Sequence, residues 1–152
     1  MHVKVAMIVV GAFVASLSAA NGAAQGRLAD TTGLDCTFTV IATGTWTDGA
    51  AEARLDGSTF SIRFEEIDTD VATAEVVGPY GASSIIVRQT GDYLHLVQMF
   101  MVGPLYTTTV IDRETTDGKL MAVHTRHEYT DTSLPGFPSR PEQYYGECEV
   151  ER

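Results

Sequence analysis

Apolar and polar residues alternate with a period of two along most of the chain after position 35. In the clearest example the alternate residues are Cys36, Phe38, Val40, Ala42, Gly44 and Trp46. Most of the positions between them are threonines. Such alternation is typical of a half-buried strand, because successive side chains of a strand point to opposite faces. We therefore expect this set to face inward, with Trp46 filling the core at the end of the strand.

The same pattern predicts about eight strands, separated by turn signals such as Asp48-Gly49 and Asp117-Gly118. The strands are expected over residues 36–47, 60–65, 71–77, 85–89, 93–102, 105–111, 120–125 and about 143–150. Residues 50–55 are expected to form one short helical turn, and residues 130–142 a crossing loop or lid. Strands joined in sequence by tight turns favour an all-β antiparallel meander, closed or flattened into a lipocalin-like barrel, with a two-sheet β-sandwich as the alternative.

The strand predicted over residues 93–102 is apolar on both of its faces, with methionine at positions 99 and 101. In a strand with one solvent-exposed face, apolar and polar residues should alternate regularly. Either another part of the molecule covers its outer side, or the methionines line an adaptable cavity, or an exposed patch receives a partner.

The first 24 residues have the features of a secretory signal peptide. Lys4 precedes an apolar stretch over residues 5–17, and Ser18 and Ala20 have the spacing of a cleavage site, as do Gly22 and Ala24. A membrane anchor would need about 20 apolar residues to cross the hydrocarbon layer. We therefore expect cleavage after Ala20 or Ala24, a single β domain over residues 25–152, no stable membrane insertion, and a periplasmic or secreted protein.

Export changes the interpretation of the two cysteines, Cys36 and Cys148, which are 112 residues apart. In an oxidising compartment such a pair predicts a disulfide between the first and the last strand. Those strands become neighbours only if the sheet closes. A redox or metal-binding pair is the alternative, but the sequence has no CxxC spacing.

Composition narrows the possible partners. The chain has 20 acidic and 10 basic residues, for a formal net charge of −10. Nucleic-acid binding is not expected, because it requires Lys and Arg at the phosphates. Docking on anionic lipid is not expected either, because the sequence contains no polybasic cluster.

Three basic side chains lie close together at His124, Arg126 and His127. On a strand, His124 and Arg126 share a face and His127 points away, so the two histidines cannot share a metal ion. A guanidinium beside an imidazole could bind a carboxylate or a phosphate, because Arg offers a planar pair of donors. The alternative is the polar end of a strand facing water.

Two tyrosines, Tyr144 and Tyr145, precede Cys148 in the last predicted strand. Tyr144 shares the face of Cys148 and should point inward, while Tyr145 points outward. A tyrosine hydroxyl at a barrel mouth is a suitable ligand donor, although Tyr144 could equally cap the core. The candidate ligand-binding residues are therefore His124, Arg126, His127, Tyr144 and Tyr145.

The sequence contains no nucleophile elbow, HExxH motif, phosphate-binding glycine loop or EF-hand loop. We accordingly predict no catalytic residue, metal site or cofactor. The leading hypothesis is a binding module for an apolar or amphipathic small molecule. The second is a structural or interaction protein of the cell envelope with a fully packed core, and the third is a hydrolase-like enzyme that uses His124.

The chain also resembles a group of small uncharacterised exported bacterial β-proteins. The resemblance is carried by Thr108-Thr109-Val110, by Val123-His124-Thr125-Arg126-His127 and by the ending Gln143-Tyr144-Tyr145-Gly146-Glu147-Cys148. It implies a secreted or periplasmic β-protein and no particular activity. Separately, Gly44-Thr45-Trp46 is similar to the Gly-x-Trp of lipocalin-like barrels, although no helix is predicted after the last strand.

Overall fold

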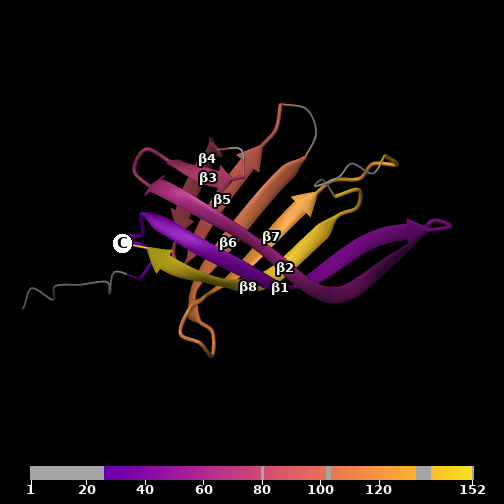
Figure 1. Ribbon diagram of the computed structural model, residues 1–152, viewed down its shortest axis with the longest axis horizontal. Coiled ribbons are helices and arrows are strands. Elements are labelled where there is room, and N and C mark those ends of the chain that lie inside the picture. The colour runs from indigo at the N-terminus through magenta and orange to yellow at the C-terminus, as the bar shows by residue number, and fades with distance from the viewer. Residues whose placement is uncertain (1–25, 80, 102–103, 133–137, 152) are drawn as a thin grey trace, which may run out of the picture.

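The computed structural model describes residues 26–79, 81–101, 104–132 and 138–151 (Figure 1). The predicted signal peptide and its cleavage sites lie outside these residues. The described part is built from eight strands: β1 (Gly33–Thr47), β2 (Ala50–Asp68), β3 (Thr73–Gly78), β4 (Gly81–Thr90), β5 (Tyr93–Met99), β6 (Leu105–Glu114), β7 (Leu120–His127) and β8 (Glu142–Glu151). No helix that is long and apolar enough to cross a membrane occurs within these ranges.

Each strand pairs with the next in antiparallel orientation, and β8 pairs back with β1, so the meander closes into a barrel. This confirms the predicted all-β closed meander over the two-sheet sandwich. At the seam Cys36 lies directly opposite Cys148, and their sulfur atoms form the predicted disulfide. The bridge therefore joins two strands that are already neighbours through hydrogen bonds.

The β1–β2 hairpin is longer than the sequence pattern predicts and projects beyond the barrel (Figure 1). The prediction of a helical turn over residues 50–55 is wrong, because these residues pair with β1 as far as the turn at Asp48-Gly49. Both turn residues have positive φ, which Asp and Gly tolerate better than most residues and which matches the twist of a hairpin. Sequence alternation is weak over residues 50–57 because all of these residues are exposed.

A β-bulge in β1 between Phe38 and Val40 changes which residues face the interior. Cys36 and Phe38 are buried as predicted, but beyond the bulge Ile41 packs against the core while Val40 is exposed. One extra residue in a strand moves the following side chains to the opposite face. Consequently Trp46 does not fill the core; it is 52% exposed on the hairpin and packs edge-on against Tyr129.

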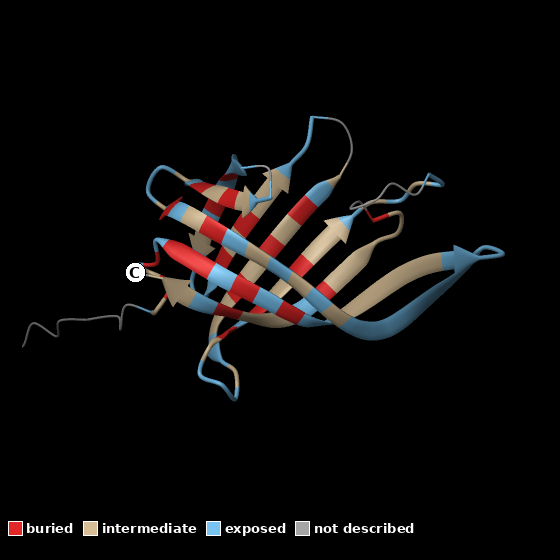
Figure 2. Cartoon of the chain, in the orientation of Figure 1, coloured by how far each residue is buried: buried red, intermediate tan, exposed pale blue. Residues whose placement is uncertain are grey.

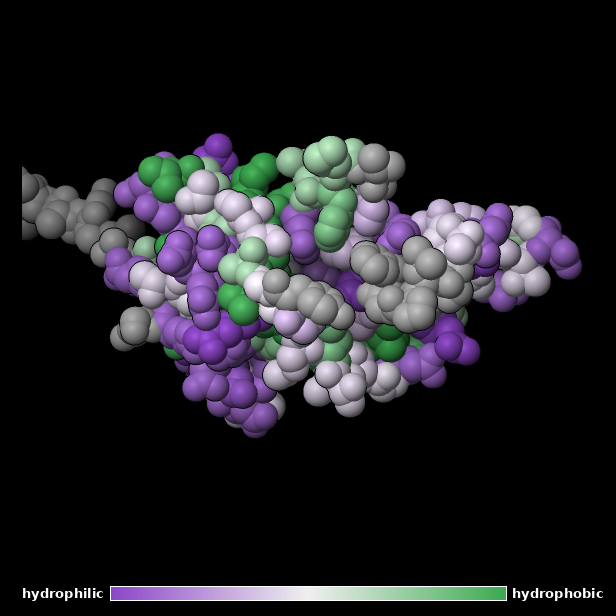
Figure 3. All heavy atoms as spheres, turned by 45° about the horizontal axis from the view of Figure 1, so that its top comes forward, coloured by the Kyte–Doolittle hydropathy of each residue, from purple (hydrophilic) through white to green (hydrophobic). Residues whose placement is uncertain are grey.

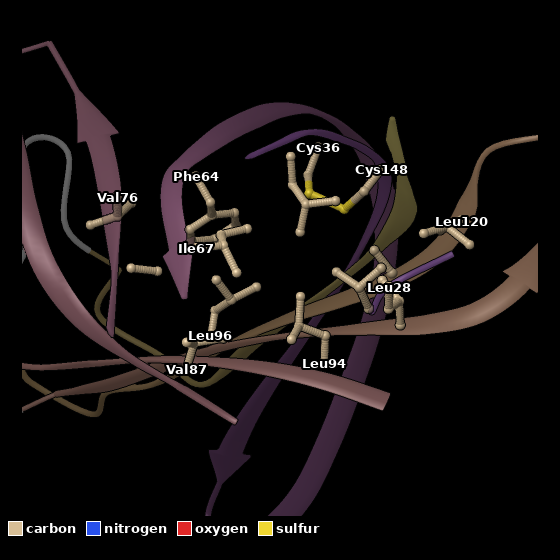
Figure 4. Packing of buried hydrophobic residues seen from close by; sticks show 14 of the residues in the cluster. Leu28, Cys36, Phe64, Ile67, Val76, Val87, Leu94, Leu96, Leu120 and Cys148 are labelled. Atoms are coloured by element: carbon tan, nitrogen blue, oxygen red, sulfur yellow. A yellow bond between two sulfur atoms is a disulfide. The ribbon is translucent and has the colours of Figure 1, made fainter. Parts of the chain in front are cut away.

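The hydrophobic core fills the end of the barrel that holds the β2–β3, β4–β5 and β6–β7 connections (Figure 2). Before β1, the turn over residues 27–30 inserts Leu28 into this end, close to Leu94 and Leu120 (Figure 4). Arg27 holds the turn by an ion pair with Glu114 and a hydrogen bond to the Gly118 carbonyl. This end of the barrel is therefore packed and closed.

Strand β5 is apolar on both faces, as its sequence indicates. Leu94 and Leu96 are buried, whereas Val97 and Met99 lie on the outer side, and Met99 and Met101 are exposed. Among the described residues the methionines do not line a cavity, so that interpretation of the strand is wrong.

Candidate ligand-binding site

The opposite end of the barrel contains a cavity of about 380 Å³. This end carries the β1–β2, β3–β4, β5–β6 and β7–β8 connections. Apolar side chains from β2, β3 and β5–β6 form much of the wall, and the polar members include Gln98, His124 and Arg126. In the space-filling view, hydrophobic side chains border a recessed hydrophilic region on this side of the molecule (Figure 3). The volume lies at the lower end of the range of about 300–1,000 Å³ that is usual for small-molecule sites.

Strand β7 brings His124 and Arg126 to the interior because both occupy its inward-facing positions. In the strand register His124 lies between Thr108 of β6 and Tyr144 of β8, and Arg126 lies between Tyr106 and Glu142. Two adjacent rows of inward-facing side chains thus place a cation, an imidazole and two phenols at the base of the cavity.

His124 is only 2% exposed, and both of its ring nitrogens have partners. Its Nε2 atom accepts a hydrogen bond from Nε of Arg126 at 3.2 Å. An arginine Nε–H can only donate, so the imidazole proton is on Nδ1, which donates to Oγ1 of Thr108 at 2.8 Å. Burial, and secondarily the positive charge of Arg126, lowers the pKa of His124 to about 3. The ring is therefore neutral at ordinary pH.

The guanidinium of Arg126 is surrounded by aromatic rings. Its central carbon lies 4.4 Å from the ring centre of Phe60 and 5.3 Å from those of Tyr106 and Tyr144. Such contacts stabilise a cation by about 0.5–2 kcal/mol each, more when water is excluded. The side chain of Arg126 is 17% exposed, so most of it is shielded from water.

Two tyrosine–glutamate pairs flank this cation. The hydroxyl of Tyr106 donates to Glu128 at 3.0 Å, and that of Tyr144 donates to Glu142 at 2.6 Å. Burial and, next, these hydrogen bonds raise the pKa of each tyrosine to about 12, so both phenols stay protonated. The nearest approach of Glu142 to Arg126 is 4.0 Å from Nη1, too long for a hydrogen bond.

The structure brings together three of the five predicted site residues, His124, Arg126 and Tyr144. The other two lie on the outer surface, as their strand positions indicate. His127 is exposed beside Pro141, and Tyr145 is 42% exposed and bonds to Gln143. We therefore leave His127 and Tyr145 out of the site.

Sequence reasoning missed five members of the site: Phe60, Tyr106, Thr108, Glu128 and Glu142. The alternation of Tyr106, Thr108 and Val110 in β6 could have identified an inward face that carries two polar groups. No local signal identifies Phe60, because only barrel closure brings β2 opposite β7. Glu142 was expected in a loop, but it begins β8.

A second hollow of about 340 Å³ lies on the outside of the closed end, beside Lys119 and Glu149. Arg27 lines this hollow, and its Nη2 atom is buried without a hydrogen-bond partner in the described part of the chain. Nη1 of the same side chain already bonds to the Gly118 carbonyl and pairs with Glu114, so Arg27 belongs to the turn that closes this end of the barrel. Within the described ranges no three His, Cys, Asp or Glu side chains are grouped as metal ligands.

Comparison with known proteins adds no information on the site: no protein-family model, no curated protein and no solved structure matches this chain. The function is therefore argued from the barrel and its cavity alone.

Proposed function

We propose that this protein is an exported β-barrel binding module for an apolar or amphipathic small molecule. The apolar part of the ligand would occupy the cavity at the open end of the barrel, and its polar end would lie at Arg126. The disulfide supports export to the periplasm or beyond the cell, since such bridges persist in oxidising compartments.

The observation that carries this proposal is the incomplete hydrogen bonding of Arg126. Among the described residues, the guanidinium makes one hydrogen bond, from Nε to His124, while the two terminal nitrogens have no acceptor within bonding distance. Neither nitrogen is among the fully buried atoms that lack a partner, so both remain accessible within the cavity. A ligand oxygen in the cavity would satisfy them, because Arg126 forms part of the cavity wall.

The second candidate is a structural or interaction protein of the cell envelope. It is favoured by the packed half of the barrel, where Phe38, Leu34 and Val87 are fully buried. A cavity of about 380 Å³ at the other end is not required for that role. An enzyme that uses His124 as a general base has less support, because both ring nitrogens are already engaged.

Native mass spectrometry tests the proposal on protein exported with its own N-terminal segment and purified without detergent. We expect a discrete adduct that disappears after organic extraction. The adduct should be lost in Arg126→Met and retained in Arg88→Met, which removes an exposed arginine outside the cavity. Protein without any adduct in the wild type would favour the structural role.

A further inference from the structure

We infer that the polar end of the ligand is a single carboxylate, a monoanion, and not a phosphate. This inference rests on the proposed function and specifies the chemistry of the same site. Its basis is the number and placement of charged groups around the cavity.

The hydrogen bond to His124 determines which edge of the guanidinium is available. Nε is engaged by His124, and the ring of Phe60 covers one face at 4.4 Å. The remaining donors are those of the edge formed by Nη1 and Nη2. Two coplanar N–H donors match two coplanar carboxylate oxygens in a bidentate arrangement. A phosphate can offer a similar pair of oxygens, so geometry alone does not choose between them.

The charges around the site favour the smaller negative charge. Arg126 is the only cationic side chain among the described residues that line the cavity, since His124 is neutral. Two carboxylates are already close to it, Glu142 at 4.0 Å and Glu128 on the hydroxyl of Tyr106. A ligand carboxylate adds one negative charge to this group. Arg126 is one positive charge beside two negative ones, so a phosphate monoester, which adds nearly two negative charges at neutral pH, is repelled more strongly than a carboxylate.

The remainder of the cavity favours an apolar tail. Phe60, Ile62, Val76 and Phe100 contribute to its wall, together with short polar side chains that include Ser61. Among the described lining residues only Arg126 carries a charge, and it lies at one place in the wall. This distribution suits an amphipathic molecule with one charged end and no second ionic group.

Isothermal titration calorimetry with four eight-carbon compounds tests the inference on the wild-type protein. The probes are octanoate, octyl phosphate, octan-1-ol and octylammonium, compared at pH 7.5 at one ionic strength and below the concentrations at which they form micelles. We expect octanoate to bind at least about tenfold more tightly than octyl phosphate or octan-1-ol, because like-charge contacts and unpaired donors are each penalised. Octylammonium should bind more weakly than octanoate, because an ammonium group only donates hydrogen bonds and offers no acceptor to the guanidinium.

Variants assign the preference to Arg126. In Arg126→Met the difference between octanoate and octan-1-ol should disappear, while Arg88→Met should retain it. Arg126→Lys retains the charge but loses the paired donors, and should bind octanoate more weakly than the wild type. If an Arg126 variant does not fold, the four affinities measured on the wild-type protein still test the preference for a carboxylate.

The outcomes separate the inference from the function on which it rests. Octyl phosphate binding as tightly as octanoate would overturn the carboxylate assignment and leave the binding function standing. If none of the probes binds while the exported protein carries an adduct, the assignment is also wrong and the ligand belongs to another class. Absence of both probe binding and adduct would overturn the assignment and the proposed function together.

Discussion

Nε of Arg126 donates a hydrogen bond to Nε2 of His124 over 3.2 Å, which fixes the proton of this buried, neutral imidazole on Nδ1. The same bond orients the guanidinium. Thr108 completes the chain by accepting the Nδ1 proton at 2.8 Å. His124 thus acts as a positioning residue for Arg126, which is the group we expect to contact the ligand.

The free energy of unfolding should decrease as the pH is lowered, because of His124. Its pKa is about 3 in the folded protein and about 6.5 when unfolded, so only the unfolded state takes up the proton between these values. The stabilising contribution is complete above pH 6.5 and is lost toward pH 3, at up to about 1.4 kcal/mol per pH unit. Urea unfolding between pH 7 and pH 4 should therefore show a smaller pH dependence in His124→Gln than in the wild type.

The exposed histidine of the same strand provides the control for this measurement. His127→Gln removes a surface imidazole and should leave the pH dependence of stability as it is in the wild type. Parallel pH profiles for the wild type and His124→Gln would show that the buried ring is not the titrating group.

Gly146 should not tolerate a side chain. A Cβ atom there would lie 2.6 Å from Cα of Phe38 and would collide with the carbonyl oxygen of Thr37, both in the backbone of β1 at the bulge. Backbone cannot move aside as a flexible side chain can, so Gly146→Ala should cost at least about 2–3 kcal/mol in unfolding free energy.

Gly57→Ala is the matched variant, because a Cβ atom at Gly57 meets no atom within 4 Å. Its unfolding free energy should stay within about 1 kcal/mol of the wild type. Equal effects of the two substitutions in chemical denaturation would contradict the close approach of β8 to β1.

Leu28 should stabilise the closed end of the barrel although it lies outside every strand. It is 1% exposed, and replacement of a buried leucine by alanine typically costs about 2–5 kcal/mol. Leu55, on the projecting hairpin, is 71% exposed, so Leu55→Ala should have little effect. A thermal melt of both variants checks this, and a Leu28→Ala protein as stable as the wild type would show that the turn before β1 does not fill the core.

Removal of the disulfide should destabilise the protein without changing its topology. The bridge closes a loop of 112 residues, and loops of this length are worth about 4–5 kcal/mol in the chain-entropy model, although measured values are often lower. We expect the double variant Cys36→Ala/Cys148→Ala to lose about 2–5 kcal/mol in urea unfolding while its circular dichroism remains that of a β-protein. A loss below 1 kcal/mol would show that the β1–β8 hydrogen bonds alone hold the seam.

Features that depend on neighbouring residues were predictable from the sequence. Period-two alternation located most of the strands, and Asp48-Gly49 marked a hairpin turn that the structure contains. Alternation also separated His124 from His127 and Tyr144 from Tyr145 correctly, because adjacent and third-neighbour side chains of a strand point to opposite faces. The cysteine pair indicated a closed sheet, because a disulfide between the first and the last strand requires them to be neighbours.

Features that depend on long-range register became visible only in the folded barrel. The bulge between Phe38 and Val40 is set by pairing with β2 and β8, and it turned Trp46 out of the core. Closure of the barrel placed Phe60 against Arg126, although they are far apart in the sequence. A strand pattern is local, whereas the face exposed beyond a bulge and the residues that meet across a barrel depend on hydrogen bonds between distant segments.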